Sequence, residues 1–391
     1  MTTYPLFSAN AHIIEPAGLF EGRVAAKWAD QAPRLLPLEP GGQFWLFGEK
    51  MSFLHRTCLM AGSRDTGWWQ DVGNFNKIAA LEELRPGCYD AKERIRDMDE
   101  DGIAITACTS SPAGMGFGGD MFSHAAEPEL GIACMRAWND WYHEEWVAAA
   151  TDRFVPVGCT WYRDPEVAAA EVRRNAARGF KAVALRNPTD LGEPWLGLEH
   201  WDPLLAACEE TGTVIVHHTE GLDWFPRRDN RANMYPYGMT LTLYQACAMD
   251  FLAHCMWGGI TVRFPRLKIL IAEAGGSWLP HFIRRIDWTR QHSGFTQEGW
   301  PDPELTPLDM LKRNFAFSTQ EFDVPAELAN SFGTELWMVE EDYPHIESYF
   351  PGTGKHINGK LAGLPRELAE AMAWKNASRF FDFPMPKRFL A

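Results

Sequence analysis

The chain has 391 residues, of which 46% are hydrophobic and 23% are charged, a composition typical of a globular protein with a large core. Its 52 acidic residues outnumber its 37 Lys and Arg, and the formal net charge of −15 argues against a nucleic-acid partner, because phosphate binding needs a basic surface. Eight scattered cysteines without a CxxC pair, no signal-peptide pattern and no long apolar stretch indicate a cytoplasmic protein without a membrane partner.

Short apolar segments rich in β-branched residues alternate with helical patterns along the chain. The pattern at 164–179 has Asp164 as N-cap, Pro165 in the first turn and Gly179 as its end, and residues 201–212 repeat this order. Apolar strands separated by helices predict a parallel sheet covered on both faces, and eight of them indicate an α/β fold of the (β/α)₈ TIM-barrel type. The predicted strands are 4–12, 102–110, 153–160, 180–188, 212–220, 267–276, 314–322 and 335–345.

Residues 17–90, between the first two predicted strands, are rich in aromatic residues, Gly and Pro. A TIM barrel needs about 250 residues, so we interpret this stretch as an insertion that forms a lid or pocket wall for a bulky apolar ligand. A doubly wound open sheet is the alternative, but no GxGxxG motif follows the first strand. No linker divides the chain, so residues 1–391 are expected to form a single domain.

Polar side chains gather at the ends of the predicted strands, where TIM barrels carry their function. Asn10 and His12 lie two residues apart and therefore on one face of the first strand. Carboxylates and imidazoles that are far apart in the sequence but meet at one mouth of the barrel indicate a metal site. The residues concerned are His12, Glu15, His217, His218, Glu220, Glu273, Gln320, Glu321, Glu340, Glu341 and Asp342.

Alternation along the strands separates neighbours within this set. His217 and His218 point in opposite directions, so one of them is expected to be a ligand and the other to support it or to move protons. Glu340 and Asp342 share a face, and Glu341 points away from both unless the strand has already ended.

Three segments resemble motifs of the amidohydrolase superfamily, in particular the amidohydrolase-related group that includes the aminocarboxymuconate-semialdehyde decarboxylase type. SANAHIIEP (8–16) is similar to its D-x-H-x-x-E-P opening, AEAGGSWLPHFIRRID (272–287) to its E-S-G-x-x-W-x-P, and EEDYPHIESYFP (340–351) to its S-D-Y-P-H. The resemblance extends from residue 8 to about 351 and implies the barrel fold. Position by position, it implies metal ligands at His12, His217 and Asp342, and metal or acid/base roles for Glu15 and Glu273.

The chain departs from these motifs at two places. Asn10 replaces the usual acidic or His ligand, and Glu340 and Glu341 precede Asp342 where small residues are usual. The carbamylated lysine of the dinuclear hydrolases is also missing, because the fourth strand ends in Leu185-Arg186-Asn187. A second metal would therefore have to be bridged by glutamate.

Such a carboxylate-rich ligand set resembles a small branch of nonheme diiron monooxygenases that hydroxylate diterpenoids. We accordingly expect two Fe, O2, an external electron donor and a bulky apolar, terpenoid-like acid or thioester as substrate. Glu273, His218 and Glu341 are the candidate catalytic residues. The expected metal ligands are His12, Glu15, His217, Glu273, Glu340 and Asp342.

Arg227, Arg228 and Arg231, in the segment after the fifth strand, are candidates for binding a substrate carboxylate or phosphate, although a solvated basic loop explains them equally well. The alternative function is a mononuclear Zn- or Mn-dependent hydrolase or decarboxylase, in which Glu273 or His218 is the general base. A third interpretation is a binding protein that has lost its metal at Asn10. Surface Trp residues would suit a homo-oligomer as readily as a lid.

Overall fold

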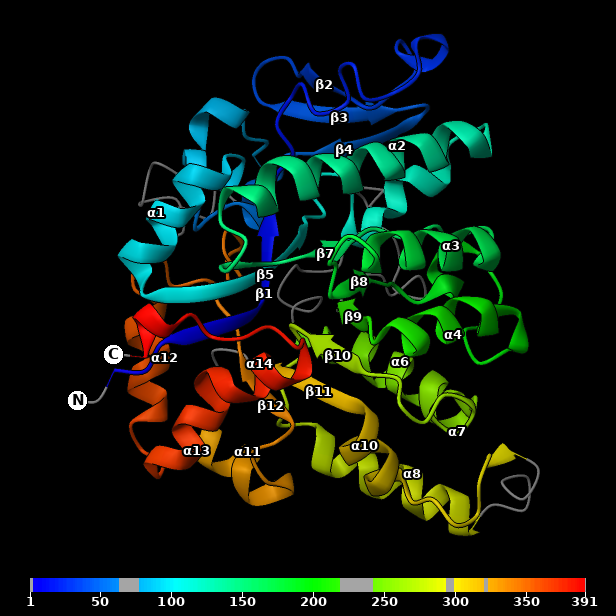
Figure 1. The fold of residues 1–391 in the computed structure, drawn as a ribbon, viewed down its shortest axis with the longest axis vertical. Helices are drawn as coiled ribbons and strands as arrows, with labels where there is room; N and C mark the ends of the chain where they lie inside the picture. Colours follow the sequence, from blue (N-terminus) through cyan, green and yellow to red (C-terminus); the bar gives the residue numbers. More distant parts are fainter. Residues whose placement is uncertain (1–2, 63–76, 219–241, 293–298, 320–322, 391) are drawn as a thin grey trace.

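The structure is a computed structural model that describes residues 3–62, 77–218, 242–292, 299–319 and 323–390. All eight predicted strands are present, and they pair with one another in parallel (Figure 1). The third predicted strand is split at Pro156, which has no N–H to donate to a neighbour. The strands are β1 (Leu6–Ile13), β5 (Ile103–Ser110), β6 (Phe154–Val155), β7 (Val157–Gly158), β8 (Ala182–Ala184), β9 (Val214–His218), β10 (Ile269–Ala272), β11 (Phe315–Thr319) and β12 (Trp337–Val339).

These strands follow one another around a barrel. The order is β1-β5-β6, then β7-β8-β9-β10-β11-β12 after the interruption at Pro156. The circle closes between β12 and β1, where the His12 N–H donates to the Tyr343 carbonyl (2.8 Å) and the Asp342 N–H donates to the Asn10 carbonyl (3.2 Å). The predicted α/β fold with a TIM barrel is confirmed.

Two apolar cores lie on the two sides of the strands. Small side chains such as Ala9, Ala107 and Ala272 face the barrel interior, and Phe381 from the C-terminal segment closes its lower end by stacking on Phe7 at 5.9 Å. The larger outer core fills the space between the strands and the surrounding helices. The polar strand ends are therefore left at the opposite, upper mouth of the barrel.

Helices follow the strands and cover the outside of the barrel. As predicted, Asp164 caps α3 by accepting from the N–H groups of Glu166 and Val167, and Pro165 is its first residue. None of the described helices is long and apolar enough to cross a membrane. The helices are α1 (Ala91–Asp101), α2 (Pro128–Trp141), α3 (Pro165–Ala176), α4 (Asp202–Thr211), α6 (Gln245–Trp257), α7 (Ile260–Arg263), α8 (Leu279–His292), α10 (Pro307–Asn314), α11 (Pro325–Phe332), α12 (Thr353–Leu361), α13 (Arg366–Glu370) and α14 (Asn376–Phe380).

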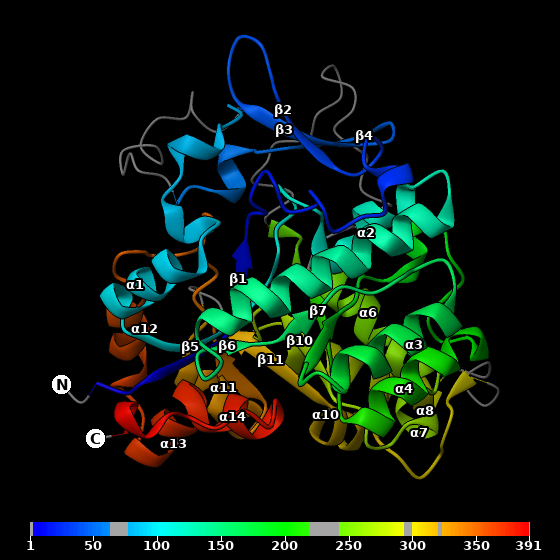
Figure 2. The same cartoon turned by 45° about the horizontal axis from the view of Figure 1, so that its top comes forward.

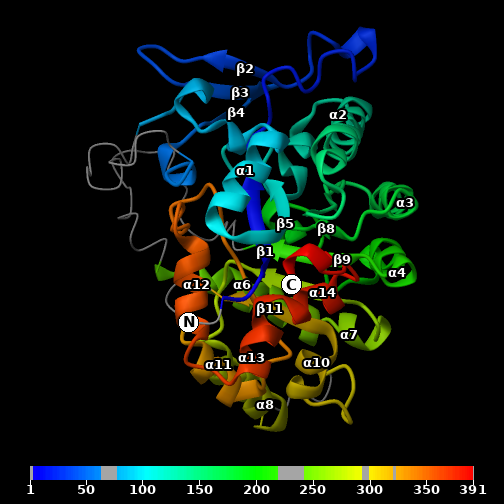
Figure 3. The ribbon, with the colours of Figure 1, turned by 60° about the vertical axis from the view of Figure 1, so that its left-hand side comes forward.

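The segment between β1 and α1 contains a small antiparallel sheet of β2 (Arg34–Pro37), β3 (Gln43–Phe47) and β4 (Lys50–Phe53). Figures 2 and 3 show this sheet above the end of β1, on the side of the barrel mouth. Its buried residues Trp45 and Phe47 contact Phe20 and Phe122, with ring centroids 6.2 and 6.4 Å apart. The insertion thus lies where a lid was expected, although residues 63–76 lie outside the described chain and its role stays a prediction.

Candidate metal centre

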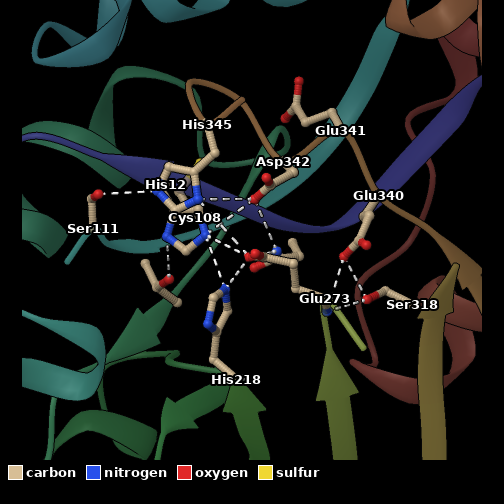
Figure 4. Close-up of polar contacts among 12 residues, drawn as sticks. His12, Cys108, Ser111, His218, Glu273, Ser318, Glu340, Glu341, Asp342 and His345 are labelled. Atoms are coloured by element: carbon tan, nitrogen blue, oxygen red, sulfur yellow. Dashed lines mark hydrogen bonds and ion pairs between the residues drawn. The ribbon is translucent and has the colours of Figure 1, made fainter. Parts of the chain in front are cut away.

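Four potential ligands meet where β1, β10 and β12 end (Figure 4). His12 lies in β1, Glu273 directly follows β10, and Asp342 and His345 lie in the turn after β12. One ligand atom from each residue lies within 4.8 Å of the others, and all four residues are buried. Two carboxylates and two imidazoles in one buried place are the kind of donor set that a divalent cation takes.

The two carboxylates face two stacked imidazole rings. His12 Nε2 lies 3.3 Å from Asp342 Oδ1 and 3.6 Å from Glu273 Oε2. His345 Nδ1 lies 3.4 Å from Asp342 Oδ1 and 3.9 Å from Glu273 Oε2. The rings of His12 and His345 are 3.8 Å apart and nearly parallel, at 11°. His345 was not among the expected site residues, although it lies in the motif-like segment 340–351.

The neighbours His217 and His218 point apart, as alternation predicts. His218 Nε2 contacts Glu273 Oε2 directly and lies 3.2 Å from His12 Nε2. His217 Nδ1 instead lies 3.1 Å from the Leu185 carbonyl oxygen, and its ring stacks on Phe251 at 3.7 Å. The structure therefore brings His218, and not His217, into contact with the cluster.

Burial sets the protonation of these groups. It lowers the pKa of His12 to about 4 and that of His217 to about 3, and it holds the pKa of His345 well below its ordinary value. Burial alone would raise the pKa of Glu273, but the positive charge of His218 and hydrogen bonds from His12 and His218 lower it well below its ordinary value. Neutral imidazoles and an ionised carboxylate are the forms that bind metals.

Asn10 lies on the same side as His12, as expected from their spacing. Its Nδ2 donates to Asp342 Oδ1 (3.3 Å) and lies 3.5 Å from Glu273 Oε2. Within the described chain, Asn10 Oδ1 and Asp342 Oδ2 are buried beside the cluster and have no hydrogen-bond partner. Burial and the charge of Glu273 also raise the pKa of Asp342. A divalent cation would relieve both conditions, so these residues fit a metal.

Glu340 holds the backbone of Glu273. Glu273 has a left-handed backbone conformation, with φ of 56°, and so has Asp342, with φ of 48°. Non-glycine residues adopt this conformation only where neighbouring contacts impose it. The Glu273 N–H donates to Ser318 Oγ (2.9 Å) and to Glu340 Oε2 (3.3 Å), and the Ser318 hydroxyl donates to the same Glu340 oxygen (2.5 Å). Glu340 thus lies beside the four-residue cluster and outside it.

Glu341 points away from the cluster, as Figure 4 shows. Its buried carboxyl group faces Thr106 of β5 and the positive charge of Arg94 of α1. Burial raises the pKa of Glu341 to about 7, and Arg94 and Thr106 oppose this rise. The expected catalytic role of Glu341 therefore finds no support in its position.

Glu15 also lies outside the cluster. Its carboxylate accepts hydrogen bonds from the Ser110 hydroxyl (2.6 Å), Trp138 Nε1 (2.8 Å) and the Met115 N–H (3.3 Å). These bonds tie the loop after β5 to the end of β1, and the Ser110 carbonyl oxygen in turn lies 3.4 Å from His12 Nδ1. Arg227, Arg228 and Arg231, the expected substrate-binding residues, lie outside the described residues, as do Glu220, Gln320 and Glu321.

Comparison with known proteins extends this picture. The chain is 25% identical over 301 residues to the 2-amino-3-carboxymuconate-6-semialdehyde decarboxylase of Dictyostelium discoideum, which covers 74% of this chain and 75% of that protein. An amidohydrolase structure from Mycobacterium avium subsp. paratuberculosis matches 97% of this chain and 98% of its own, with a TM-score of 0.76 and 19% identity. A dihydroxybenzoic acid decarboxylase from a Polaromonas species, crystallised with manganese and 2-nitroresorcinol, matches 97% of both chains, with a TM-score of 0.65 and 17% identity.

These relatives overturn the expectation of a nonheme diiron monooxygenase. The curated relative is a decarboxylase and not an oxidoreductase, and the Polaromonas structure holds manganese, so two Fe are not supported. The structure supplies the physical reason. Glu340 is engaged by Ser318 and the Glu273 backbone, and Glu341 points out of the barrel, so the described residues offer no pair of bridging glutamates.

The comparisons support the coarser part of the resemblance. A family model described as amidohydrolase matches residues 43–383, which is most of the chain. Together with the barrel and the buried cluster at the ends of its strands, this match shows that the chain belongs to the amidohydrolase family.

Proposed function

We propose that this chain is a nonoxidative decarboxylase that uses one divalent cation, Zn2+ or Mn2+. The observation that carries the proposal is the similarity to the Dictyostelium decarboxylase over 74% of the chain. The names of that enzyme and of the Polaromonas decarboxylase indicate substrates with a carboxylate on unsaturated carbon. The same class of carboxylic acid is the proposed substrate here, in place of a terpenoid.

The cation would be held by the four clustered side chains. His12, Asp342 and His345 are the proposed ligands, with Glu273 as the fourth donor. Burial favours this role, because it keeps both imidazoles neutral at physiological pH. When bound, the cation supplies positive charge that stabilises the negative charge developing on the substrate oxygens.

The contact between His218 and Glu273 suits proton transfer. Decarboxylation breaks the bond between the substrate carbon and its carboxylate, releases CO2 and places one proton on that carbon, so it needs neither O2 nor an electron donor. His218 is the proposed proton donor, and the ionised Glu273 favours its protonated form. The ring of Phe117 lies 4.6 Å from the ring of His218 and shields it from water.

The direct test is release of CO2 by metal-loaded protein. The protein is stripped with a chelator, reloaded with Mn2+ or Zn2+, and incubated in D2O with hydroxybenzoic acids and unsaturated dicarboxylic acids. We expect CO2 and a product with one new C–D bond, and neither from stripped protein. His218→Asn should keep its metal and lose most of the rate.

A different reaction of the metal-loaded protein would contradict the proposed function. If metal-loaded protein releases no CO2 but cleaves esters, lactones or amides, the decarboxylase proposal fails. A mononuclear hydrolase, in which Glu273 acts as general base towards water, then takes its place.

A further inference from the structure

A fully buried arginine lies directly behind the candidate metal centre. Arg94 belongs to α1, outside the barrel, and its side chain is 0% exposed. Its guanidinium donates to the carbonyl oxygens of His12 and Gly87, the second at 2.7 Å, and its central carbon lies 4.5 Å from the centroid of the Tyr343 ring. Burying this charge is costly unless partners compensate it, so these contacts need an explanation beyond packing.

Arg94 joins the two strands between which the barrel closes. The His12 N–H donates to the Tyr343 carbonyl oxygen at 2.8 Å, and Arg94 binds the carbonyl oxygen of the same His12 residue. The guanidinium also lies against the ring of Tyr343, which follows Asp342 directly. One side chain therefore contacts the backbone that carries His12 and the turn that carries Asp342 and His345. These are the two halves of the proposed ligand set.

Further contacts hold Arg94 and Tyr343 in place. Arg94 Nη1 donates to Cys108 Sγ of β5 at 3.6 Å. The Tyr343 hydroxyl donates to Asp97 Oδ2 (2.8 Å), and Asp97 in turn pairs with Arg85 at 2.7 Å. The network is anchored in α1 and surrounds the turn after β12.

We propose that Arg94 is a positioning residue that keeps His12 in register with Asp342 and His345 for cation binding. The contact of Arg94 with the His12 carbonyl oxygen holds β1 against the turn after β12. The rigid guanidinium fork fixes the directions of two carbonyl contacts at once, whereas the donors of a lysine ammonium group rotate. The inference rests on the proposed function in one respect, namely that the cluster binds a divalent cation.

The test measures binding of the metal alone. Metal-free wild type, Arg94→Met and Arg94→Lys are titrated with MnCl2 in a calorimeter, and their thermal unfolding is recorded without metal. Loss of a residue that orients a metal ligand typically costs about 10- to 100-fold in metal affinity. We expect that loss for Arg94→Met and a smaller one for Arg94→Lys.

Arg153 provides a matched control. It is likewise buried, donates to the carbonyl oxygens of Ala104 and Ile103 (2.9 and 2.7 Å), and pairs with Asp99 at 2.5 Å, but it does so at the start of β5, at the opposite end of the barrel. Arg153→Met should lower the unfolding temperature and leave Mn2+ affinity within about twofold, since it removes no contact to a ligand.

The outcomes separate the two proposals. If wild type binds no Mn2+ or Zn2+, the proposed function fails. If wild type binds and Arg94→Met binds equally well, or if Arg153→Met loses as much affinity as Arg94→Met, the positioning role of Arg94 is refuted. Should Arg94→Met not fold, Arg94→Lys decides, and wild-type Mn2+ affinity in that variant refutes the role.

Discussion

Replacement of Glu340 by leucine tests how Glu273 is held in the site. The left-handed conformation of Glu273 costs about 1–3 kcal/mol. The Glu340 carboxylate accepts hydrogen bonds from the Glu273 N–H (3.3 Å) and the Ser318 hydroxyl (2.5 Å), and hydrogen bonds to a charged group contribute about 1.5–3 kcal/mol each. The bond from the Glu273 N–H alone therefore contributes about as much as the strain costs. Without it the backbone of Glu273 is expected to relax and withdraw its side chain from the cluster.

The expected result is a fall in Mn2+ affinity of about 10- to 100-fold, where each tenfold corresponds to about 1.4 kcal/mol. It is measured by calorimetric titration of metal-free protein, together with the rate of CO2 release. Glu340→Gln keeps an acceptor oxygen, so its Mn2+ affinity should lie between those of wild type and Glu340→Leu. Glu171→Gln is the control, because Glu171 is buried on α3 among Arg136, Arg174 and Asn139, away from the strand ends. Unchanged affinity in Glu340→Leu would refute the reasoning.

Four other replacements give further tests. His345→Ala should abolish tight Mn2+ binding whereas His217→Ala should weaken it less, and the reverse order in a titration would restore His217 as the ligand. Glu15→Gln should lower the free energy of unfolding by about 1–3 kcal/mol in urea, because its amide faces the Met115 N–H, yet still bind one metal per chain by elemental analysis. Burial raises the pKa of Asp101 from 3.8 to about 6, although contacts from Thr353 and Gly354 oppose this rise. Because the folded state binds this proton more tightly, the free energy of unfolding of wild type should fall by up to about 3 kcal/mol as pH rises from about 4 to 6. Asp101→Asn should not show this fall. Equal pH profiles of the two proteins in urea unfolding would contradict the prediction.

The fold was predictable because its signals are local. Apolar runs locate all eight strands, and Asp164 with Pro165 begins α3 as expected, since a cap and a first turn depend on a few adjacent residues. The split of the third strand at Pro156 follows from the missing N–H of proline. The motif-like segments 8–16, 272–287 and 340–351 likewise contain all four residues of the cluster.

The chemistry was harder to predict from composition. Three adjacent acids, Glu340-Glu341-Asp342, indicate two metals and oxygen if every acid is counted as a ligand. In the structure the three carboxylates face three different environments: the Glu273 backbone, Arg94 and the cluster. Which environment each acid meets depends on elements that are distant in the chain.

The sequence by itself determined the barrel, the order of its strands and the end of the barrel at which polar groups gather, because periodicity and capping are properties of short segments. Only the tertiary structure decided that His345 joins His12, Glu273 and Asp342, and that Glu15 does not. The physical reason lies in the backbone: Glu273 and Asp342 have left-handed conformations that break the simple alternation of a strand. Those conformations are held by contacts from other strands: Ser318 and Glu340 accept from the Glu273 N–H, and the Asn10 carbonyl of β1 accepts from the Asp342 N–H.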